Sequence, residues 1–592
     1  MKNNQNTIAP SNQRHALRNQ AIQRLMLGII ILVLINVIGS FVFTRFDLTA
    51  EKRYTLSKAT RQMLKKIDDY VYFKIYLEGD FPAGFKRLRN ETRELLDEMR
   101  AYNPYINYEF INPNATSNPK ERENVYRRLI EKGLMPTDLQ VKSNEKESRT
   151  IIFPGALASY KGKEVPVQLL SEKIGVPPEE VLNYSIQNLE YNIANTLRIL
   201  STTYKPRVAF IYGHGELGEE YIFDISRSMA EFYTVERIKI NENINALTEH
   251  KVDSGRTSIF NKYKAIIIAK PDSAFSEKDK FIIDQFVMRG GKVLWFIDGV
   301  KAEMDSLQNK PTTLALPLDL NLEDMLFRYG ARINSDLLLN PNCIPIVMVT
   351  GKIGNQPRFS LVPWVFFPLL NPATRHPIVN NLNAVRTQFV SSIDTIPVKN
   401  IKKTLLLSTG QYTRKAPSPV IIDLNIAGKD PDPKLFNQSG TPTAVLLEGE
   451  FESLYKNRIP PSISEASEIG YKDKSRHTQM LVVADGDIIR NQINRRSGVP
   501  LPLGYDQDTR QTFGNKDFIL NALNYMIDDS RLVEIRSREI KLRLLDPQRV
   551  EAERLRWQTL NILAPVLFVI TIGLLKAFYR KKKYGSRFPF AR

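Results

Sequence analysis

Two long apolar segments, one near each end of the chain, place the strongest constraint on its fold. Neither Leu25 to Phe43 nor Trp557 to Leu575 contains a charged side chain. As a helix, each segment would be about 28 Å long, close to the thickness of the hydrocarbon core of a bilayer. A helix in a soluble domain does not need to be apolar on every face over this length. We therefore expect two membrane-spanning helices at 25–43 and 557–575, with a soluble region between them.

The charges beside these segments predict their orientation. Residues 1–24 hold four basic and no acidic side chains, and residues 576–592 hold seven basic and no acidic ones. By the positive-inside rule both are cytoplasmic tails, which places residues 44–556 in the periplasm of a double-membrane bacterium. A cleaved signal peptide is the alternative for the first segment. It would have a shorter apolar run and a small-residue cleavage site, so we expect an uncleaved anchor in the inner membrane.

Composition and missing motifs argue against several functions. The net charge is +19, but much of it lies in the two tails and no interleaved aromatic and basic motif accompanies it, so we expect no nucleic-acid binding. The single cysteine, Cys343, excludes an intrachain disulfide. The chain contains no Walker A loop, no Gly-x-Ser-x-Gly elbow and no histidine spacing typical of metal sites. We therefore predict a protein that is not an enzyme and needs no cofactor.

The soluble region is predicted to form two α/β domains. Over 44–203, a β-α-β-α-β-β order suggests a small thioredoxin-like domain and a connector helix. Over 204–530, near-continuous apolar strands alternate with helices, which favours a doubly wound sheet of flavodoxin or amidotransferase type, covered on both faces. Prolines interrupt this pattern at about 355–474, which we interpret as a β-rich insertion with antiparallel strands. Residues 531–556 are predicted to form a juxtamembrane strand and helix.

Three predicted strands of the second domain end in charged residues beside glycines. The charged residues at these ends are His214, Glu216, Asp298, Asp485 and Asp487. Carboxyl ends of parallel strands face one crevice, so these five side chains are candidates for a single ligand or metal site. Hard cations prefer such clustered oxygens, although the identity of a metal is not indicated. The other interpretation is turn chemistry, in which Gly permits the bend and the acid caps the next helix.

Four residues within the membrane segments are candidates for helix packing. Asn36 would seek a hydrogen-bond partner on another helix, because an amide is poorly solvated by lipid. The alternative is that the bilayer tolerates this single amide. Gly28, Gly39 and Gly573 would allow another helix to approach closely.

Several motifs between the segments resemble those of the gliding-motility protein family GldG. They are Arg45 to Thr49, Lys52 to Ser57, Gly213 to Glu216, Trp364 to Leu370, His376 to Val379, Ala484 to Asp487 and Phe513 to Asn515. Each is short, but together, in this order, they extend the resemblance over nearly the whole chain.

The resemblance implies a role in an ABC transporter. GldG-like proteins are auxiliary membrane subunits that act with a separate ATPase, GldA, and a permease, GldF. They are associated with gliding in bacteria that also use type 9 secretion, and other proteins of these machineries are further expected partners. The interior resembles a non-catalytic domain shared with an intraflagellar transport protein, and the family supplies no catalytic residues.

We therefore expect a non-catalytic, two-pass periplasmic subunit that contacts the lipid bilayer, a permease and an ATPase. Two alternatives stay open. One is a solute-binding subunit with its ligand at the strand ends. The other is a membrane-anchored hydrolase, which would need a nucleophile elbow.

Overall fold

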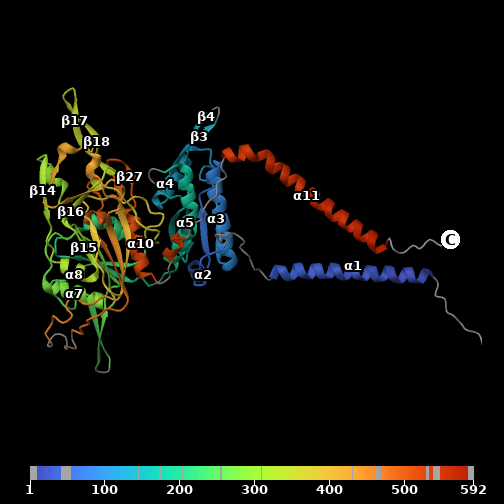
Figure 1. Cartoon of the computed structure of the whole chain (residues 1–592), viewed down its shortest axis with the longest axis horizontal. Helices are drawn as coiled ribbons and strands as arrows, with labels where there is room; N and C mark the ends of the chain where they lie inside the picture. The colour runs from blue at the N-terminus through green and yellow to red at the C-terminus, as the bar shows by residue number, and fades with distance from the viewer. Residues whose placement is uncertain are drawn as a thin grey trace, which may run out of the picture. The chain divides into compact units, whose positions relative to one another are not determined.

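The computed structural model shows two compact units, Met1–Arg538 and Glu539–Arg592. Within the first unit we distinguish a small lobe (residues 55–202 with 532–537) and a large lobe (residues 204–528), both visible in Figure 1. The structure describes residues 10–41, 55–143, 146–171, 176–202, 204–253, 256–308, 310–429, 431–460, 466, 469–528, 532–537 and 547–584.

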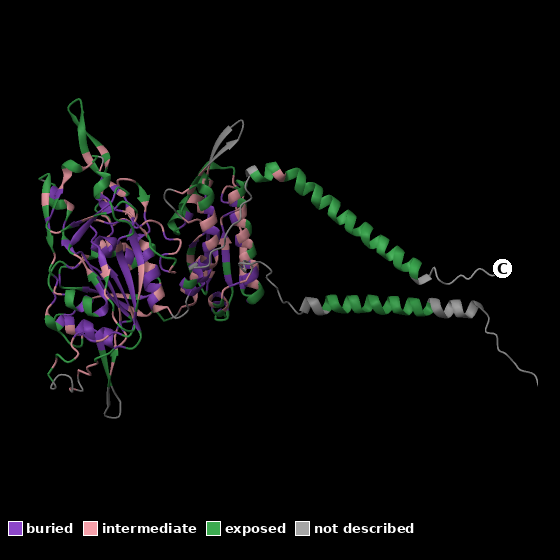
Figure 2. Cartoon of the chain, viewed as in Figure 1, coloured by how far each residue is buried: buried purple, intermediate pink, exposed green. Residues whose placement is uncertain are grey.

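The two apolar segments form long helices, α1 (Pro10–Phe41) and α11 (Pro547–Tyr584). Each contains a stretch that is long and apolar enough to cross a membrane, Asn19–Val37 and Arg549–Lys582, and no residue of either stretch is buried (Figure 2). Such helices are compatible with a membrane-anchored protein.

The four packing candidates lie on these two helices. The Asn36 side chain donates to the Leu32 carbonyl one turn earlier, at 3.0 Å, so its amide has a partner within its own helix. A Cβ at Gly28 or Gly573 would meet nothing within 4 Å among the described residues, and Gly39 also lies within α1. Packing against a partner helix stays a prediction for all four.

The small lobe is built on a four-stranded mixed sheet with the order β2-β1-β5-β6. Its strands are β1 (Val71–Ile75), β2 (Ile106–Phe110), β5 (Gly155–Tyr160) and β6 (Lys163–Gln168), beside a hairpin of β3 (Thr137–Ser143) and β4 (Lys146–Ile152). Its helices are α2 (Lys58–Leu64), α3 (Ala83–Tyr102), α4 (Pro119–Glu131) and α5 (Pro178–Ser201). Ser57 caps α2 by accepting from the Thr60 amide. The thioredoxin-like class stays a prediction.

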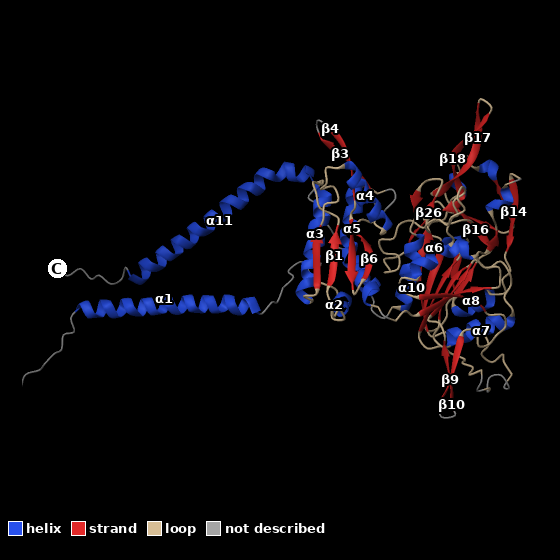
Figure 3. Cartoon of the chain, turned by 180° about the vertical axis from the view of Figure 1, so that it is seen from behind, coloured by secondary structure: helices blue, strands red, loops and turns tan. Residues whose placement is uncertain are grey.

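The large lobe, whose strands are drawn in red in Figure 3, is built on a central sheet. This sheet has eight strands in the order β19-β21-β24-β25-β12-β11-β7-β8. Five neighbouring strands are parallel: β7 (Arg207–Tyr212), β8 (Thr234–Lys239), β11 (Ala265–Ala269), β12 (Lys292–Phe296) and β25 (Thr478–Val483). Three further strands extend the sheet through antiparallel pairs: β24 (Pro442–Gly449), β21 (Ile401–Thr409) and β19 (Leu370–Pro372). The sheet is therefore mixed rather than parallel throughout.

This arrangement corrects the prediction of a separate insertion at 355–474. Strands β21 and β24 come from that range, yet both belong to the central sheet. They are antiparallel, as predicted, and Ala444 to Leu447 are fully buried. The prolines do not exclude sheet pairing, because Pro442 opens its strand, where a missing amide hydrogen is tolerated.

Helices cover both faces of this sheet. They are α6 (Glu219–Met229), α7 (Glu277–Met288), α8 (Glu323–Tyr329) and α10 (Asn515–Ile527). Along β11, Ile266 faces a cluster that includes Ile283 of α7, whereas Ile267 faces a cluster with Ile225 of α6 and Phe518 of α10. Successive strand residues point to opposite faces, so the run of apolar residues reflects burial on both sides, as predicted.

The remaining elements of the large lobe form short sheets and turns. Its further strands are β9 (Thr248–Asp253), β10 (Arg256–Asn261), β13 (Val300–Lys301), β14 (Thr312–Pro317), β15 (Ala331–Ile333), β16 (Asp336–Leu339), β17 (Cys343–Ile353), β18 (Gln356–Pro368), β20 (Ile393–Thr395), β22 (Arg414–Pro417), β23 (Val420–Asp423), β26 (Tyr505–Asp506) and β27 (Gln511–Thr512). Its 3₁₀ helices are η1 (Met304–Leu307), η2 (Leu424–Ile426), η3 (Pro433–Leu435) and η4 (Gly486–Ile489). Around Trp364, Phe366 and Phe389 they enclose a separate aromatic core.

After the large lobe, the chain returns to the small lobe. The predicted juxtamembrane strand is wrong where the structure describes it, because residues 532–537 form a 3₁₀ helix, η5 (Leu532–Ser537). Residues 538–546 lie outside the described residues, and the predicted helix begins at Pro547. Residues three apart share one face of a 3₁₀ helix, so Leu532 and Ile535 both enter the small-lobe core.

Candidate functional site

Three of the five predicted site residues come together at the carboxyl ends of two parallel strands. Asp298 follows β12, and Asp485 and Asp487 follow its neighbour β25. One carboxylate oxygen from each lies within 4.8 Å of the others, and all three residues are buried. We call these residues the aspartate cluster.

A lysine and several backbone amides satisfy the aspartate cluster. Lys270, which follows β11, places its Nζ 2.5 Å from Asp487 Oδ2 and 3.6 Å from Asp298 Oδ2. The Gly486 amide donates to Asp298 at 2.6 Å, and the Asp487 amide donates to Asp485 at 2.7 Å. The lysine ammonium group therefore supplies a counter-charge to two of the three carboxylates.

Burial and the charge of Lys270 shift the pKa values of the three acids by different amounts and in different directions. Burial raises the pKa of Asp298 to about 6, against the opposing charge of Lys270. Burial, together with the charges of Asp487 and Asp298, raises the pKa of Asp485 well above its usual range. Burial acts in the same direction on Asp487, but Lys270 and Arg490 outweigh it and hold the pKa of Asp487 below its usual value. Asp487 therefore loses its proton at the lowest pH of the three acids, beside the ammonium group, and Asp298 becomes ionised as pH rises through about 6.

A polar cavity of about 340 Å³ lies beside Lys270 and Asp487. Besides these two residues, its lining includes Tyr221, Glu303, Asp305, Arg386, Gln388, Arg490, Asn491, Gln492, Arg495 and Gln507. The position agrees with the rule that ligands of open α/β sheets bind outside the carboxyl ends of the strands. Sequence reasoning missed Arg386, because it lies within the range interpreted as an insertion. For Arg490 the one available signal was its position three residues after Asp487.

His214 and Glu216 form a different cluster. His214 Nε2 lies 2.9 Å from Asp279 Oδ2 of α7, its Nδ1 lies 3.2 Å from Glu216 Oε1, and its ring stacks on Phe275 with the centroids 3.8 Å apart. Burial opposes the protonated form, but Glu216 and Asp279 outweigh it and raise the pKa of His214. His214 therefore bonds to both Glu216 and α7, and the structure does not group these two predicted residues with the aspartate cluster.

The two glycines beside His214 support the turn interpretation at this strand end. Gly213 and Gly215 have φ angles of 122° and 76°, which L side chains rarely adopt. A Cβ at Gly215 would lie 1.6 Å from a carboxylate oxygen of Asp272. The glycines are thus required for the turn that directs His214 towards α7.

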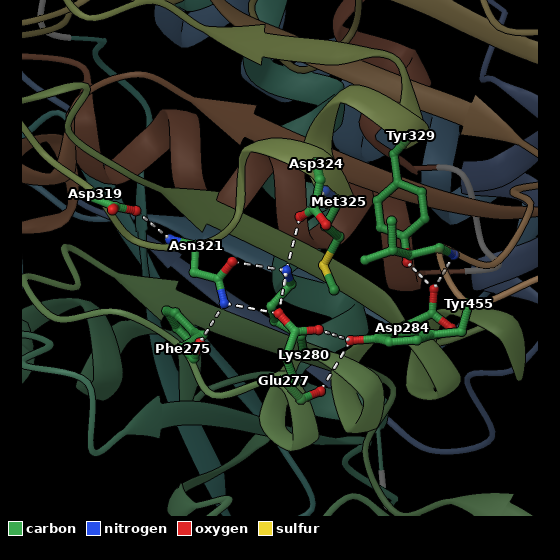
Figure 4. A network of polar contacts seen from close by, with 11 residues as sticks. Phe275, Glu277, Lys280, Asp284, Asp319, Asn321, Asp324, Met325, Tyr329 and Tyr455 are labelled. Carbon is green, nitrogen blue, oxygen red and sulfur yellow. Dashed lines mark hydrogen bonds and ion pairs between the residues drawn. The ribbon is translucent and has the colours of Figure 1, made fainter. Parts of the chain in front are cut away.

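A second polar network on α7 was not predicted (Figure 4). The fully buried Lys280 places its Nζ 2.9 Å from Asp324 and 3.2 Å from Asn321. One turn later, the buried Asp284 accepts a hydrogen bond from the Tyr329 hydroxyl at 2.8 Å. These contacts join α7 to α8 and to the loop before it, so we assign the network a structural role.

The fold and the terminal helices together are compatible with the class of membrane-anchored α/β proteins. A family profile described as "ABC-type uncharacterized transport system" matches residues 205–522, which is more than half of the chain. The chain therefore belongs to this family of ABC transport system auxiliary proteins, and we regard it as an accessory transporter component, consistent with the expected lack of enzymatic activity. A second profile, a domain of unknown function (DUF7088), matches residues 50–159 in the small-lobe region.

Individual relatives are distant. An uncharacterized protein of Borreliella burgdorferi is 22% identical over 438 residues, which cover 73% of this chain and 78% of the relative. Among solved structures, the mmIFT52 N-terminal domain matches with 11% identity and a TM-score of 0.30, covering 54% of this chain and 97% of that domain. At this TM-score the likeness supports no conclusion about the fold.

Proposed function

We propose that this protein is a non-catalytic periplasmic subunit of an ABC transporter, anchored at both ends and working with a separate ATPase and permease. The observation that carries the proposal is the pair of apolar terminal helices, whose membrane-length stretches contain no buried residue. Apolar helices whose described residues are exposed over this length present apolar surface to lipid and to the helices of a permease. The family match supports the transporter context.

The connectivity supports a specific role for the small lobe. Helix α1 precedes this lobe, and η5, which completes its core, precedes α11. Both anchors are therefore joined by short connections to the same lobe, whereas the large lobe lies between α5 and η5 in the chain. We propose that the small lobe couples movements of the permease to the large lobe.

Co-purification tests this proposal. The full chain, tagged and extracted in mild detergent, should retain a permease and an ATPase. A variant in which residues 25–43 and 557–575 are replaced by leucine–alanine spans should stay in the membrane and lose both partners. Recovery of the intact chain without any permease or ATPase would contradict the proposal.

Labelling of single cysteines tests the topology. In a Cys343→Ser background, Lys352→Cys lies at the exposed end of β17, and Ser586→Cys lies in the basic tail. A membrane-impermeant maleimide added to spheroplasts should label position 352 and spare position 586. The reverse pattern would place the body in the cytoplasm and exclude a periplasmic subunit.

The motif resemblance suggests a narrower role in gliding motility and type 9 secretion, with GldA-like and GldF-like partners. Deletion of the gene should then abolish surface spreading, and the wild-type copy should restore it. If the source bacterium spreads and secretes normally without this chain, the general transporter role stands and the gliding role fails.

The polar cavity favours a second candidate function, a solute-binding subunit. The cavity lies at the strand ends, where ligands of such sheets bind, and its lining is rich in charged and amide side chains. This candidate is compatible with the first, because an accessory subunit can also present a solute to its permease.

A further inference from the structure

We propose that the cavity binds a small polar ligand through an anionic group, a carboxylate or a phosphate, held by Arg386 and Arg490. This inference rests on the solute-binding candidate and names its ligand class. The cavity volume of about 340 Å³ is near the lower end for small-molecule sites, so the ligand has about the size of a monosaccharide derivative.

Arg386 is a buried cation without a full set of partners. The residue is 8% exposed and lines the cavity, and its Nε has no hydrogen-bond partner among the described residues. Its ion pair with Asp506 is loose, at 3.6 Å. Asp506 already accepts hydrogen bonds from Gln492 and from the amide and hydroxyl of Thr509. A buried guanidinium has five N–H donors, and an anion in the cavity would supply the missing acceptors.

The position of Arg386 is set by its backbone. The Arg386 amide donates to Asn515 Oδ1, and Asn515 Nδ2 donates to the Arg386 carbonyl, both at 2.9 Å. Two residues later, the Gln388 amide donates to Asp485 of the aspartate cluster at 3.0 Å. Asn515 is itself buried at the start of α10. The guanidinium is therefore attached to a backbone fixed before any ligand arrives, which lowers the entropic cost of binding.

Arg490 provides a second cation on the same cavity. Its guanidinium lies over the Tyr221 ring, 4.3 Å from the centroid, and contacts Asp487 at 3.3 Å. Because Lys270 also pairs with Asp487, that carboxylate does not cancel both cations. Planar guanidinium groups suit the paired oxygens of carboxylates and phosphates.

The remaining lining indicates what else the ligand carries. Glu303 and Asp305 are exposed carboxylates, and Gln388 adds an amide side chain. The other amide side chains of the lining already bond within the protein and shape the wall of the cavity: Asn491, Gln492 and Gln507. Amides both donate and accept, and carboxylates accept from hydroxyl groups. An acidic or phosphorylated sugar combines an anionic group with several hydroxyls and meets both requirements.

Calorimetric titration of the detergent-purified full chain tests the inference. The probes are glucuronate, glucose 6-phosphate, inorganic phosphate and, as the uncharged comparison, glucose. We expect saturable binding of glucuronate or glucose 6-phosphate and none of glucose. A response to inorganic phosphate alone would support an anion site but overturn the sugar-derivative class.

Single substitutions test whether the charged probe binds at Arg386 in the cavity. Arg386→Gln should weaken the binding of the charged probe at least tenfold, and Arg386→Lys should weaken it less. Arg289→Gln is the matched control, because Arg289 also has a buried, unpartnered Nε but donates to the Ile469 and Gly470 carbonyls and is not part of the cavity lining. The affinity of this control should be unchanged.

Three outcomes would overturn the inference: no binding of any charged probe to the folded wild-type chain, equal binding by Arg386→Gln, or an equal loss in Arg289→Gln. If Arg386→Gln does not fold, the affinity of Arg490→Gln for the charged probe tests the inference instead. Arg490 lies at the partly exposed edge of the cavity, and its substitution should weaken binding at least tenfold. A chain that retains its permease but binds no probe would disprove only this inference and leave the subunit proposal intact.

Discussion

At the scale of single residues, Lys270 determines the chemistry of the aspartate cluster. Three buried carboxylates at one sheet edge resemble a site for a divalent cation. The ammonium group of Lys270 already lies 2.5 Å from Asp487 and 3.6 Å from Asp298, and it supplies positive charge to these two acids. A buried cation that is hydrogen-bonded and paired offsets much of the cost of burying the acids. The contacts of Lys270 and of the Gly486 amide with the cluster join the loops that follow β11, β12 and β25.

Replacement of Lys270 by methionine should expose this dependence. We expect Lys270→Met to lower the free energy of unfolding at pH 7 by about 3–5 kcal/mol, because Asp487 and Asp298 lose their counter-charge. The loss should be smaller at pH 5, where the freed carboxylates can take up protons. Urea unfolding of the detergent-solubilised chain measures both values.

The control is Lys278→Met on α7, whose ammonium group pairs with Glu242 at the surface, so its removal should leave the stability nearly unchanged. A Lys270→Met protein as stable as the wild type would show that the cluster does not need its cation.

Asp298 should produce a measurable pH dependence of stability. Its pKa in the folded protein is about 6, above the ordinary aspartate value of 3.8, so the folded state holds this proton more tightly than the unfolded state. The contribution of Asp298 to stability is therefore greatest below about pH 4 and is lost as pH rises through about 6.

In Asp298→Asn this contribution disappears. Asparagine can still accept a hydrogen bond from the Gly486 amide and does not ionise. As pH rises from 4 to 7, the free energy of unfolding of the variant should therefore increase relative to that of the wild type by about 2–3 kcal/mol. Urea unfolding at pH 4, 5.5 and 7 measures the difference. Parallel pH profiles for the two proteins would contradict the raised pKa.

At the scale of elements, the apolar pattern predicted strands more reliably than their partners. The four apolar residues Ala444 to Leu447 indicated a strand, and β24 is that strand. Its neighbour β25 lies about thirty residues further along the chain, so no local signal showed that the two strands pair. For η5 the pattern itself misled, since apolar residues two or three apart suit a strand and a 3₁₀ helix alike.

A core truncation should confirm β24 as a central strand. Leu446 is fully buried, and Leu446→Ala should cost about 2–5 kcal/mol through lost burial and the cavity left behind. Ile421→Ala on β23 is the control, because Ile421 is 69% exposed and should change stability by less than about 0.5 kcal/mol. Equal effects in urea unfolding would mean that β24 does not belong to the core.

At the scale of the whole molecule, contacts of Arg198 join the two lobes close to the point where the chain returns to the small lobe. Arg198 of α5 places Nη1 2.9 Å from Asp528 and donates to Asn524 of α10 at 3.0 Å. Its guanidinium also lies 4.5 Å from the ring centre of Phe232. The Arg198 and Asp528 side chains are 10% and 13% exposed, so this contact is largely shielded from solvent.

Removal of this contact should loosen the coupling between the lobes. Arg198→Leu should split thermal unfolding into two transitions and speed proteolysis near residues 202–206, because Asp528 and Asn524 lose a shared donor. Arg332→Leu, which removes an exposed ion pair with Asp394, should keep the wild-type profile. Differential scanning calorimetry and limited trypsin digestion measure both effects, and a single unchanged transition in Arg198→Leu would show that the lobes are coupled by other contacts.

The sequence by itself determined what depends on neighbouring residues: two helices apolar on every face, alternating strands and helices in the body, and acids placed directly after two strands. Tertiary structure alone decided which distant segments meet, since β24 joins the sheet, η5 completes the small-lobe core, and Lys270 and Arg386 come to one cavity from loops more than a hundred residues apart. The physical reason is that periodicity and composition act through the local backbone. Burial and charge pairing, by contrast, are properties of neighbours in space, and only the packed fold brings those neighbours together.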